Sequence, residues 1–318
     1  MKERNRLGLG TMGMSSVRNP ENSVKTIHAA LDAGITLLNT GEFYNAGESE
    51  IIVGRALKEV NHDNYFLSVK FGVLPCPEGG IYGLDVKPYN VKGHLTYSLR
   101  RLGLDYIDLY QPARQDTTVP VEEVVGAIAE QVQAGYVRHI GLSMVDAETL
   151  RRACAVHPIH TVEMEYSLVE RGIEKELIAA AKELGVKVLA FGTVGHGLLS
   201  DHILNNPADT AMTRGLLAPE HRENNLAMIR KVREIADEKG VTISQMALAW
   251  SLAKYDHVQS LIGTTNPDHL QESIDALDLE LSAEDIDRIE EALPADRVGG
   301  KGMRNYVFTD GKMFLGGV

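Results

Sequence analysis

Eight short apolar segments rich in β-forming residues alternate along this chain with longer segments of helical periodicity. This alternation is typical of parallel βαβ units, because a parallel strand needs a crossover, usually a helix, before the next strand can pair. Eight strands are the number that closes a parallel barrel. The sequence therefore predicts an α/β protein, a single (β/α)8 barrel of the TIM-barrel class. The expected strands are residues 7–10, 35–39, 66–70, 107–110, 137–142, 161–165, 186–191 and 258–262.

Amphipathic segments that we expect to be helical fill the intervals between these strands. Several of them end in Ala-Gly or Leu-Gly, a pattern that indicates a helix C-terminus. We see no linker that would split the chain, so we expect one domain over residues 1–318. The expected helices are residues 23–33, 48–60, 91–102, 121–134, 147–156, 174–184, 223–239, 243–254, 267–277 and 283–293.

Two long connections, 72–89 and 192–222, follow the third and seventh strands. Both leave the carboxyl ends of strands, which is the face where barrel enzymes place their sites. The tail at 296–318 is rich in Gly and Lys and has spaced aromatic residues. This tail either covers the barrel mouth or is a surface extension, since termini follow no fixed rule.

Charge and composition narrow the classes of partner. The formal net charge of −12 makes a nucleic acid a poor partner, because binding a polyanion needs a basic surface. No run approaches the ~20 apolar residues of a membrane span. Cys76 and Cys154 have no CxxC spacing, and the N-terminal residues lack the apolar stretch of a signal peptide, so we expect a cytoplasmic protein. His157 and His160 lack a third ligand nearby in sequence, so we expect no metal.

Six segments in order, over nearly the whole chain, resemble the aldo-keto reductase family. They are LGLGTMGMS at 7–15, GESEIIVGRALK at 47–58, LSVKFG at 67–72, LDYIDLYQPAR at 104–114, VRHIGLSMV at 137–145 and LIGTTNPDHL at 261–270. The segments NTGEFY at 39–44 and YQPAR at 110–114 are similar to those of a pyridoxal-reductase-like branch.

The resemblance implies an NAD(P)-dependent oxidoreductase that interconverts an aldehyde or ketone with an alcohol. In that family a tyrosine protonates the carbonyl oxygen while the nicotinamide delivers hydride, and a neighbouring lysine assists the tyrosine. Tyr44 and Lys70 hold these positions. The chemistry is reasonable in itself, because an ammonium beside a phenol favours the phenolate.

Two positions depart from the family pattern. Asn39 stands where most members have the aspartate that pairs with the lysine. Without that carboxylate, we expect burial to lower the pKa of Lys70 below that of its family counterpart, so that it is partly neutral in mildly alkaline solution or acts as a base.

Ala113 stands where most members have a histidine that orients the carbonyl. We expect this alanine to open volume beside the reacting carbon and to admit a bulkier substrate. Tyr110, Gln111 or Arg114 is the expected replacement contact.

The cofactor positions also carry over by resemblance. Ser143 and Glu163 correspond to residues that hold the nicotinamide carboxamide, with Glu163 in place of the usual glutamine, and Phe191 corresponds to the ring that stacks on the nicotinamide. We expect NADP as the cofactor. NAD is also possible, because a 2'-phosphate needs charged partners and the basic residues usual at two positions of the adenosine segment are absent. The other expected cofactor contacts are Gly10, Thr11, Met12, Gly192, Val194, Gly195, His196, Gly263, Thr264, Thr265, Asn266, Gln271, Glu272 and Ser273.

A second function stays open at this point. The losses at Asn39 and Ala113 are also compatible with a barrel that keeps the cofactor pocket and performs a non-redox isomerisation or elimination, or that binds a regulatory ligand. The retained Tyr44 and Lys70 favour proton transfer and hydride chemistry instead.

Overall fold

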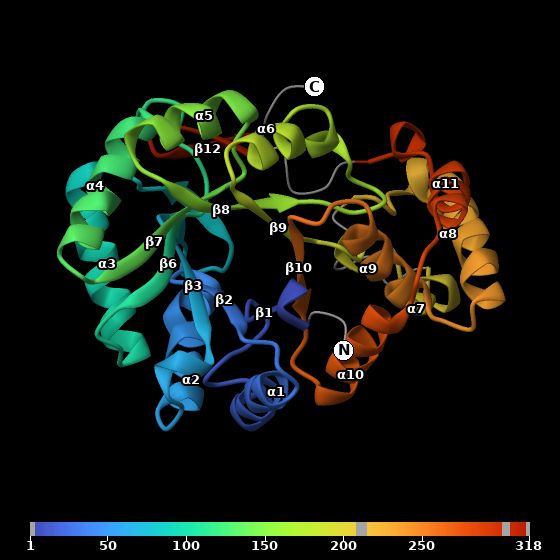
Figure 1. Ribbon diagram of the computed structural model, residues 1–318, viewed down its shortest axis with the longest axis horizontal. Helices are drawn as coiled ribbons and strands as arrows, with labels where there is room; N and C mark the ends of the chain where they lie inside the picture. The colour runs from blue at the N-terminus through green and yellow to red at the C-terminus, as the bar shows by residue number, and fades with distance from the viewer. Residues whose placement is uncertain (1–3, 208–214, 301–305, 316–318) are drawn as a thin grey trace.

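The expected strands form a closed barrel in the order β1-β10-β9-β8-β7-β6-β3-β2, and every neighbouring pair in it is parallel. The computed structural model describes residues 4–207, 215–300 and 306–315. Figure 1 shows these strands in the middle of the molecule and helices around them. The predicted (β/α)8 barrel is confirmed. The barrel strands are β1 (Leu7–Gly10), β2 (Leu37–Gly41), β3 (Phe66–Phe71), β6 (Ile107–Pro112), β7 (Val137–Ser143), β8 (Ile159–Glu165), β9 (Lys187–Phe191) and β10 (Val258–Gly263).

Most helices also lie close to their predicted positions; the short one at Asp201–Asn205 falls in the connection expected at 192–222 and was not predicted. The helices are α1 (Pro20–Asp32), α2 (Glu48–Leu57), α3 (Pro88–Leu102), α4 (Val121–Gln133), α5 (Ala147–Val156), α6 (Leu177–Glu183), α7 (Asp201–Asn205), α8 (Pro219–Glu238), α9 (Ile243–Ala253), α10 (Pro267–Asp275) and α11 (Ala283–Ala292). The glycine signals act as expected: Gly34, Gly135 and Gly185 have positive φ just after α1, α4 and α6, a conformation that glycine adopts without steric cost.

One strand boundary is wrong at both ends. The second strand was predicted at 35–39, but β2 begins at Leu37 and ends at Gly41. Ile35 is fully buried, yet its backbone N–H bonds the carbonyl of Ala30 in the turn that ends α1. Ile35 therefore belongs to the turn after α1, and strand pairing begins only at Leu37.

The barrel interior changes from apolar to polar along its axis. Leu37, Leu189 and Leu261 pack together near the middle of the barrel. Gly8 faces the same layer, and a Cβ there would lie 2.7 Å from a methyl of Leu37 and 2.9 Å from one of Leu261, so a larger residue would force these leucines to shift. Towards the carboxyl ends of the strands the inward side chains become polar, which is where a site can form.

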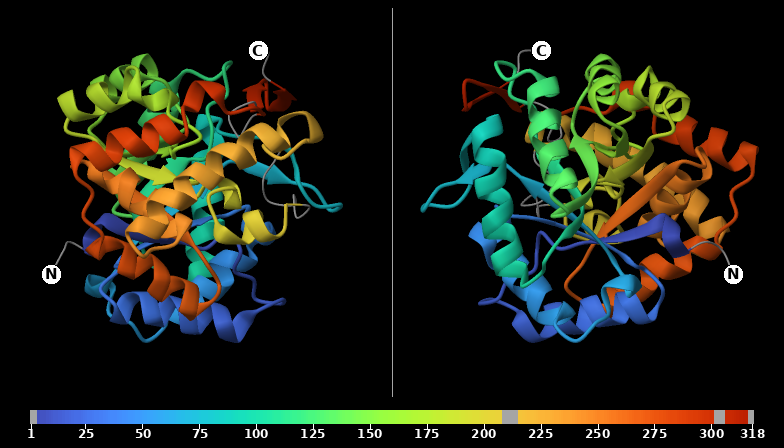
Figure 2. Two further views of the ribbon diagram at one scale, coloured as in Figure 1. Left: turned by 90° about the vertical axis from the view of Figure 1, so that its right-hand side faces the viewer. Right: turned by 60° about the vertical axis from the view of Figure 1, so that its left-hand side comes forward.

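A second, four-stranded sheet in the order β11-β12-β5-β4 lies beside the barrel. The long connection after β3 forms a hairpin, β4 (Val73–Pro75) and β5 (Ile81–Leu84), and the tail forms β11 (Tyr306–Thr309) and β12 (Lys312–Leu315). Lys312 pairs with Gly83, so the two hairpins join into one sheet. Figure 2 shows the red tail and the cyan hairpin on the same side of the barrel. The described part of the tail therefore packs on the loop at the carboxyl end of β3; residues 301–305 lie outside the described residues.

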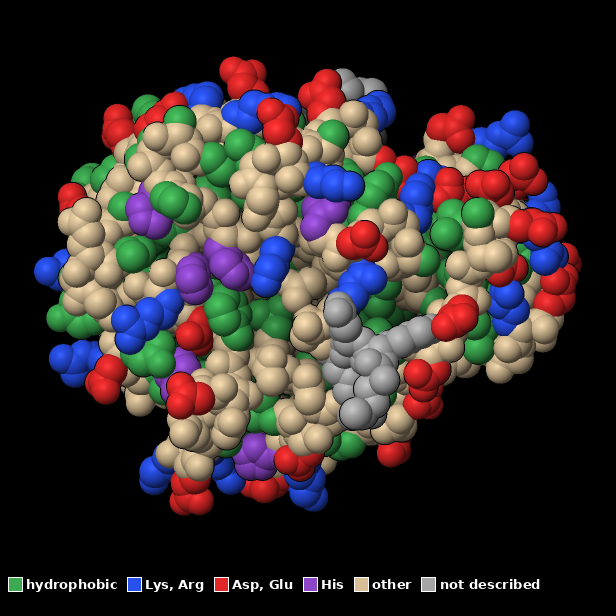
Figure 3. Space-filling view, viewed as in Figure 1, with side chains coloured by type: hydrophobic (Ala, Val, Ile, Leu, Met, Phe, Trp, Pro, Cys, Tyr) green, Lys and Arg blue, Asp and Glu red, His purple; other side chains and the backbone are tan. Residues whose placement is uncertain are grey.

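Acidic and basic side chains alternate over the face in Figure 3, with no broad area of one sign. Within the described residues, no helix is both long enough and apolar enough to span a membrane.

Gly54 in α2 is a test of helix packing. A Cβ there would lie 2.8 Å from the carbonyl carbon of Leu102 and 2.9 Å from the carbonyl oxygen of Arg101, so the backbones of α2 and α3 would have to separate. We expect Gly54→Ala to lower the free energy of unfolding by about 1–3 kcal/mol, as overpacking does. Gly126 in α4 meets nothing within 4 Å, so Gly126→Ala should raise stability by about 0.5–1 kcal/mol. Urea unfolding followed by circular dichroism measures both, and equal effects would contradict the packing argument.

Asp116 anchors the C-terminal hairpin. Its carboxylate accepts hydrogen bonds from the backbone N–H groups of Asp310 and Gly311 at 3.1 and 2.6 Å, and Phe308 beside it is 2% exposed. We expect Asp116→Ala to speed amide hydrogen exchange over 306–315 by tenfold or more, because a lost charged hydrogen bond costs about 1.5–3 kcal/mol. Thr117→Ala removes the exposed Thr117–Thr309 hydroxyl contact and should change exchange much less. Unchanged protection of the hairpin in Asp116→Ala would show that another contact holds the tail.

Candidate functional site

A buried ion pair lies inside the upper part of the barrel. The Lys70 ammonium, from β3, donates to Oε1 of Glu163 on β8 at 2.9 Å, and the two side chains are each 4% exposed. Lys70 also donates to Oδ1 of Asn39 on β2. β2 and β3 are neighbours in the barrel, whereas β8 lies across from them, so Glu163 reaches the other two side chains through the barrel interior.

Two side-chain amides donate hydrogen bonds to the other oxygen of the Glu163 carboxylate. Its Oε2 accepts from Nδ2 of Asn39 at 2.8 Å and from Nε2 of Gln111 at 2.6 Å. Both amides also donate to the Ser68 hydroxyl, at 3.2 and 3.3 Å. A buried charge is tolerated only when it is paired and hydrogen-bonded, and this network meets that condition.

Tyr44 stands over the lysine at the end of β2. It begins the short helix η2 (Tyr44–Gly47), and the Lys70 Nζ lies 5.1 Å from the centre of its ring. The turn that follows is strained, because Asn45 and Ala46 have φ of 49° and 53°. Asn45 holds the turn by donating to the carbonyls of Met12 and Met14 at 3.1 and 2.8 Å. The predicted meeting of Tyr44 with Lys70 at the carboxyl ends of the strands is therefore found.

The expectation that Lys70 lacks a carboxylate is wrong. Burial acts to lower the pKa of Lys70, but the Glu163 carboxylate and the Tyr44 hydroxyl outweigh it, so the pKa of Lys70 is raised above its ordinary value. The lysine is thus an ammonium at neutral and mildly alkaline pH, and it is not a base. With Asn39 as its only partner, Lys70 would have a lowered pKa. The carboxylate that raises the pKa belongs to β8, and nothing in the sequence indicates that this strand contacts Lys70.

Two polar atoms near this network have no partner. The Ser143 hydroxyl and Oε1 of Gln111 are both buried without a hydrogen bond. Ser143 ends β7 in register with Glu163, so it faces the same end of the barrel. Buried groups of this kind are usually satisfied, and an unsatisfied one calls for a ligand or water. A carboxamide, which both donates and accepts, would suit Ser143, so the residues present fit a nicotinamide.

The other expected cofactor residues lie at the ends of β1, β9 and β10. Gly10 pairs with Gly263 and with Asn39, and a Cβ on Gly13 would lie 3.5 Å from Thr265, so the ends of β1 and β10 are close. Thr11 is buried, and its hydroxyl oxygen lies 2.8 Å from the Ser49 hydroxyl oxygen, whereas Met12 is exposed. The remaining expected residues occupy the β9–α7 loop (Gly192, Val194, Gly195, His196), the β10–α10 loop (Thr264, Thr265, Asn266) and α10 (Gln271, Glu272, Ser273).

The start of α10 is already capped by the protein. Oδ1 of Asn266 accepts from the N–H of Asp268, and Asp268 adds a negative charge to the first turn. Gln271 donates to Asp275, and Glu272 accepts from the Thr242 hydroxyl at 2.7 Å. No basic side chain belongs to this expected set among the described residues, apart from His196 on another loop.

His196, an expected cofactor contact, has a partner within the protein. Its Nε2 lies 2.9 Å from Oε1 of Glu165, and φ at His196 is 54°. Glu165 points to the same face of β8 as Glu163, and its other oxygen is buried without a hydrogen bond. Sequence reasoning missed this pair, although the alternation of Glu163 and Glu165 along one strand signals a shared face.

One expectation about the substrate side is wrong. Tyr110 is fully buried and stacks on Phe71 with ring centres 4.6 Å apart, and burial raises its pKa. Since Gln111 points into the barrel, its neighbour Tyr110 must point outwards, away from the site. Ala113 is fully buried and belongs to the apolar core, and its expected role beside the substrate stays a prediction. Arg114 is half-buried and donates to the carbonyl of Ala113 at 2.6 Å; its substrate role stays a prediction.

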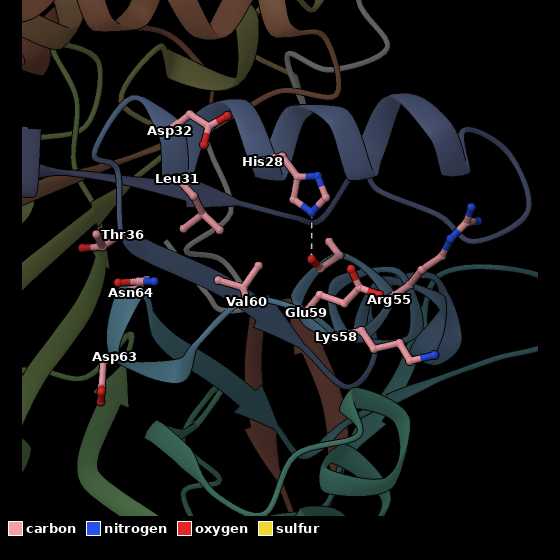
Figure 4. Close-up of a pocket in the computed structure, with 11 residues that line it drawn as sticks. His28, Leu31, Asp32, Thr36, Arg55, Lys58, Glu59, Val60, Asp63 and Asn64 are labelled. Atoms are coloured by element: carbon pink, nitrogen blue, oxygen red, sulfur yellow. Dashed lines mark hydrogen bonds between the residues drawn. The ribbon is translucent and has the colours of Figure 1, made fainter.

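A groove of about 710 Å³ lies elsewhere, between α1 and α2 (Figure 4). Its lining includes Thr36, Asp63 and Asn64, which precede β2 and β3, so it opens at the amino ends of the strands. His28 bonds the carbonyl of Ala56 at 2.8 Å within it. The groove is therefore at the opposite end of the barrel from Lys70. In the described parts of the chain, no cluster of three or more His, Cys, Asp or Glu side chains is suited to a metal ion.

Comparisons with known proteins agree with the fold. The profile of the aldo/keto reductase family matches residues 6–294. A probable aldo-keto reductase 1 from Glycine max is 34% identical over 307 residues, which are 94% of this chain and 88% of that protein. A glycerol dehydrogenase from Gluconobacter oxydans has a similar structure, with a TM-score of 0.81 and 28% identity over 94% of this chain and 95% of that one. An aldo/keto reductase from Klebsiella pneumoniae, solved with NADP and acetate, shares the fold at a TM-score of 0.72 and 24% identity, covering 91% of each chain.

Proposed function

Because this chain belongs to the aldo/keto reductase family, which places it among oxidoreductases, we propose that it is an NAD(P)-dependent enzyme that interconverts an aldehyde or ketone with an alcohol. In this proposal Tyr44 is the general acid and base, and Lys70 is its electrostatic partner. The observation that supports it most is the buried Lys70 ammonium 5.1 Å from the centre of the Tyr44 ring, at the carboxyl ends of the strands.

Tyr44 supplies the proton in the reducing direction. As negative charge develops on the carbonyl oxygen, the phenol O–H transfers its proton to that oxygen, and the Lys70 ammonium stabilises the phenolate that forms. In the oxidising direction the phenolate takes the proton from the alcohol. Tyr44 is only half-buried, so it can exchange its proton with solvent between turnovers.

NADP is the cofactor that we propose, with NAD as a further possibility. The bound nicotinamide would supply or accept the hydride. Ser143 would hold the carboxamide, Phe191 would contact the ring, and the loops after β9 and β10 would hold the phosphates and adenosine. Glu163, the other residue expected at the carboxamide, has both oxygens occupied by Lys70, Asn39 and Gln111. The acidic, self-capped start of α10 offers a 2'-phosphate little charge compensation, which is why NAD is retained.

The substrate in this proposal is a small carbonyl compound or alcohol. The alternative of a non-redox or purely ligand-binding barrel rested on Asn39 and Ala113. The carboxylate of Glu163 weakens the first of these reasons, because the lysine has a counter-charge after all. We also propose a cytoplasmic location, in keeping with two cysteines that are both free.

Tyr44→Phe tests the proposed acid. We expect kcat for carbonyl reduction to fall by about 10²–10⁴-fold, since the ring remains but the proton is lost. The assay follows the absorbance of NADPH or NADH with a panel of aldehydes, ketones, sugars and polyols. Tyr97→Phe, which changes a tyrosine 64% exposed on α3, is the matched control and should keep wild-type turnover. Full activity in Tyr44→Phe would remove Tyr44 from the mechanism, and a panel without turnover by the wild type would favour the ligand-binding alternative.

Ser143→Ala tests the proposed carboxamide contact. Because the hydroxyl has no internal partner, its removal should change the free energy of unfolding by less than about 0.5 kcal/mol. The loss of one hydrogen bond to the ligand should weaken nucleotide binding by about 0.5–1.5 kcal/mol, or about 2- to 12-fold in Kd. Calorimetry with NADP and NAD measures this, with Ser98→Ala on α3 as a control. Unaltered affinity for both nucleotides would place the carboxamide elsewhere.

A further inference from the structure

Glu163 is placed to control the charge of the site. It comes from β8, which lies opposite β2 in the closed barrel order, and it reaches across the interior to Lys70 and Asn39. Its Oε1 is occupied by Lys70 and its Oε2 by the amides of Asn39 and Gln111. Most of its capacity as an acceptor is therefore used inside the protein, before any ligand binds.

Lys70, Glu163 and Asn39 form a closed ring of hydrogen bonds. Lys70 donates to both other residues, and Asn39 donates to Glu163 in turn. Positions 39 and 163 thus each present one oxygen to the ammonium, and one N–H···O bond joins them. With a carboxylate at 39 and an amide at 163, each position would still present one oxygen to the ammonium, and the bond between them would reverse. The Gln111 amide would turn so that its unpartnered Oε1 accepts from position 163, and the Ser68 hydroxyl would donate to position 39.

We propose that Glu163 is the counter-ion of this site, a positioning residue whose carboxylate holds Lys70 as an ammonium beside Tyr44, and that positions 163 and 39 can exchange the carboxylate and the amide. Its effect on turnover rests on the proposed oxidoreductase function; its effect on the charge of Lys70 does not.

The groups around Lys70 make this assignment specific. The ionisable groups that act on it most strongly are Glu163 from β8 and Tyr44 from η2. Asn39 from β2 accepts its hydrogen bond, while Gln111 from β6 and Ser68 from β3 touch its partners, and all three are neutral. Without the Glu163 carboxylate, Tyr44 would be the main group left to oppose the desolvation of a fully buried ammonium.

The resemblance offers a different role for Glu163, which is direct contact with the nicotinamide carboxamide. The two roles predict different results for the same variants. A counter-ion can be replaced from position 39, because the ammonium lies within hydrogen-bond reach of both positions. A cofactor contact made at position 163 gains nothing from a carboxylate at position 39.

The experiment compares the wild type with Glu163→Gln, Asn39→Asp/Glu163→Gln and Asn39→Asp. The first readout needs no substrate: NMR of the ¹⁵N-labelled lysine side chains against pH, with Lys70→Met used to assign the Lys70 signal. We expect the Lys70 ammonium signal of the wild type to persist to high pH. Its titration midpoint should fall by a pH unit or more in Glu163→Gln and return towards the wild type in the double variant.

The second readout is kcat for carbonyl reduction against pH, together with the Kd for NADP. We expect kcat of Glu163→Gln to fall at least tenfold, with its alkaline limb moved to lower pH, since each unit of pH above the lysine midpoint removes about tenfold of the ammonium. The double variant should recover most of that loss, with little change in Kd. Asn39→Asp should keep the ammonium to high pH.

The results separate the two proposals. An unchanged Lys70 titration in Glu163→Gln, or a double variant no better than Glu163→Gln with a weakened Kd in both, would overturn the counter-ion role. If Glu163→Gln does not fold, as circular dichroism would show, the double variant decides: wild-type folding and Lys70 titration support the proposal, and their loss overturns it. A wild type that reduces no carbonyl would defeat the proposed function, while the lysine titration would still decide the role of Glu163.

Discussion

The buried ion pair between Lys70 and Glu163 is the constraint around which the upper barrel is organised. Two charges withdrawn from water are costly unless the geometry is good and every remaining lone pair is used. Here the side-chain amides of Asn39 and Gln111 donate hydrogen bonds to the carboxylate, and both also donate to the Ser68 hydroxyl. Five inward side chains on four strands therefore depend on one another, which explains why this layer is polar although it is buried.

An apolar layer inside the barrel and a strained turn at the strand ends flank this network. Leu37, Leu189 and Leu261 pack together inside the barrel, in keeping with the packed interior of barrels of this class. Above it, positive φ at Asn45 and Ala46 turns the chain sharply after Tyr44. Strain of this kind persists only where neighbours hold it, and the bonds from Asn45 to the β1–α1 loop do so.

The rim of the mouth is assembled from segments far apart in the chain. The connection after β3 and the C-terminal tail make one small sheet, and Asp116 ties that sheet to the loop after β6. Arg114, a candidate substrate contact, belongs to the same loop. The position of the tail and the position of this arginine are thus coupled through two backbone hydrogen bonds to one carboxylate.

The sequence by itself determined the elements and the main pair of reactive residues. Period-2 and period-3.6 patterns located the strands and helices, and the motifs placed Tyr44 and Lys70 at strand ends that closure must bring to one face. Only the tertiary structure decided the partner of the lysine, because Glu163 lies 93 residues away and its reach across the barrel depends on strand tilt and register. The same holds for Tyr110 and Gln111: one residue of register sends the first outwards and the second into the site, and nothing local in YQPAR fixes that choice.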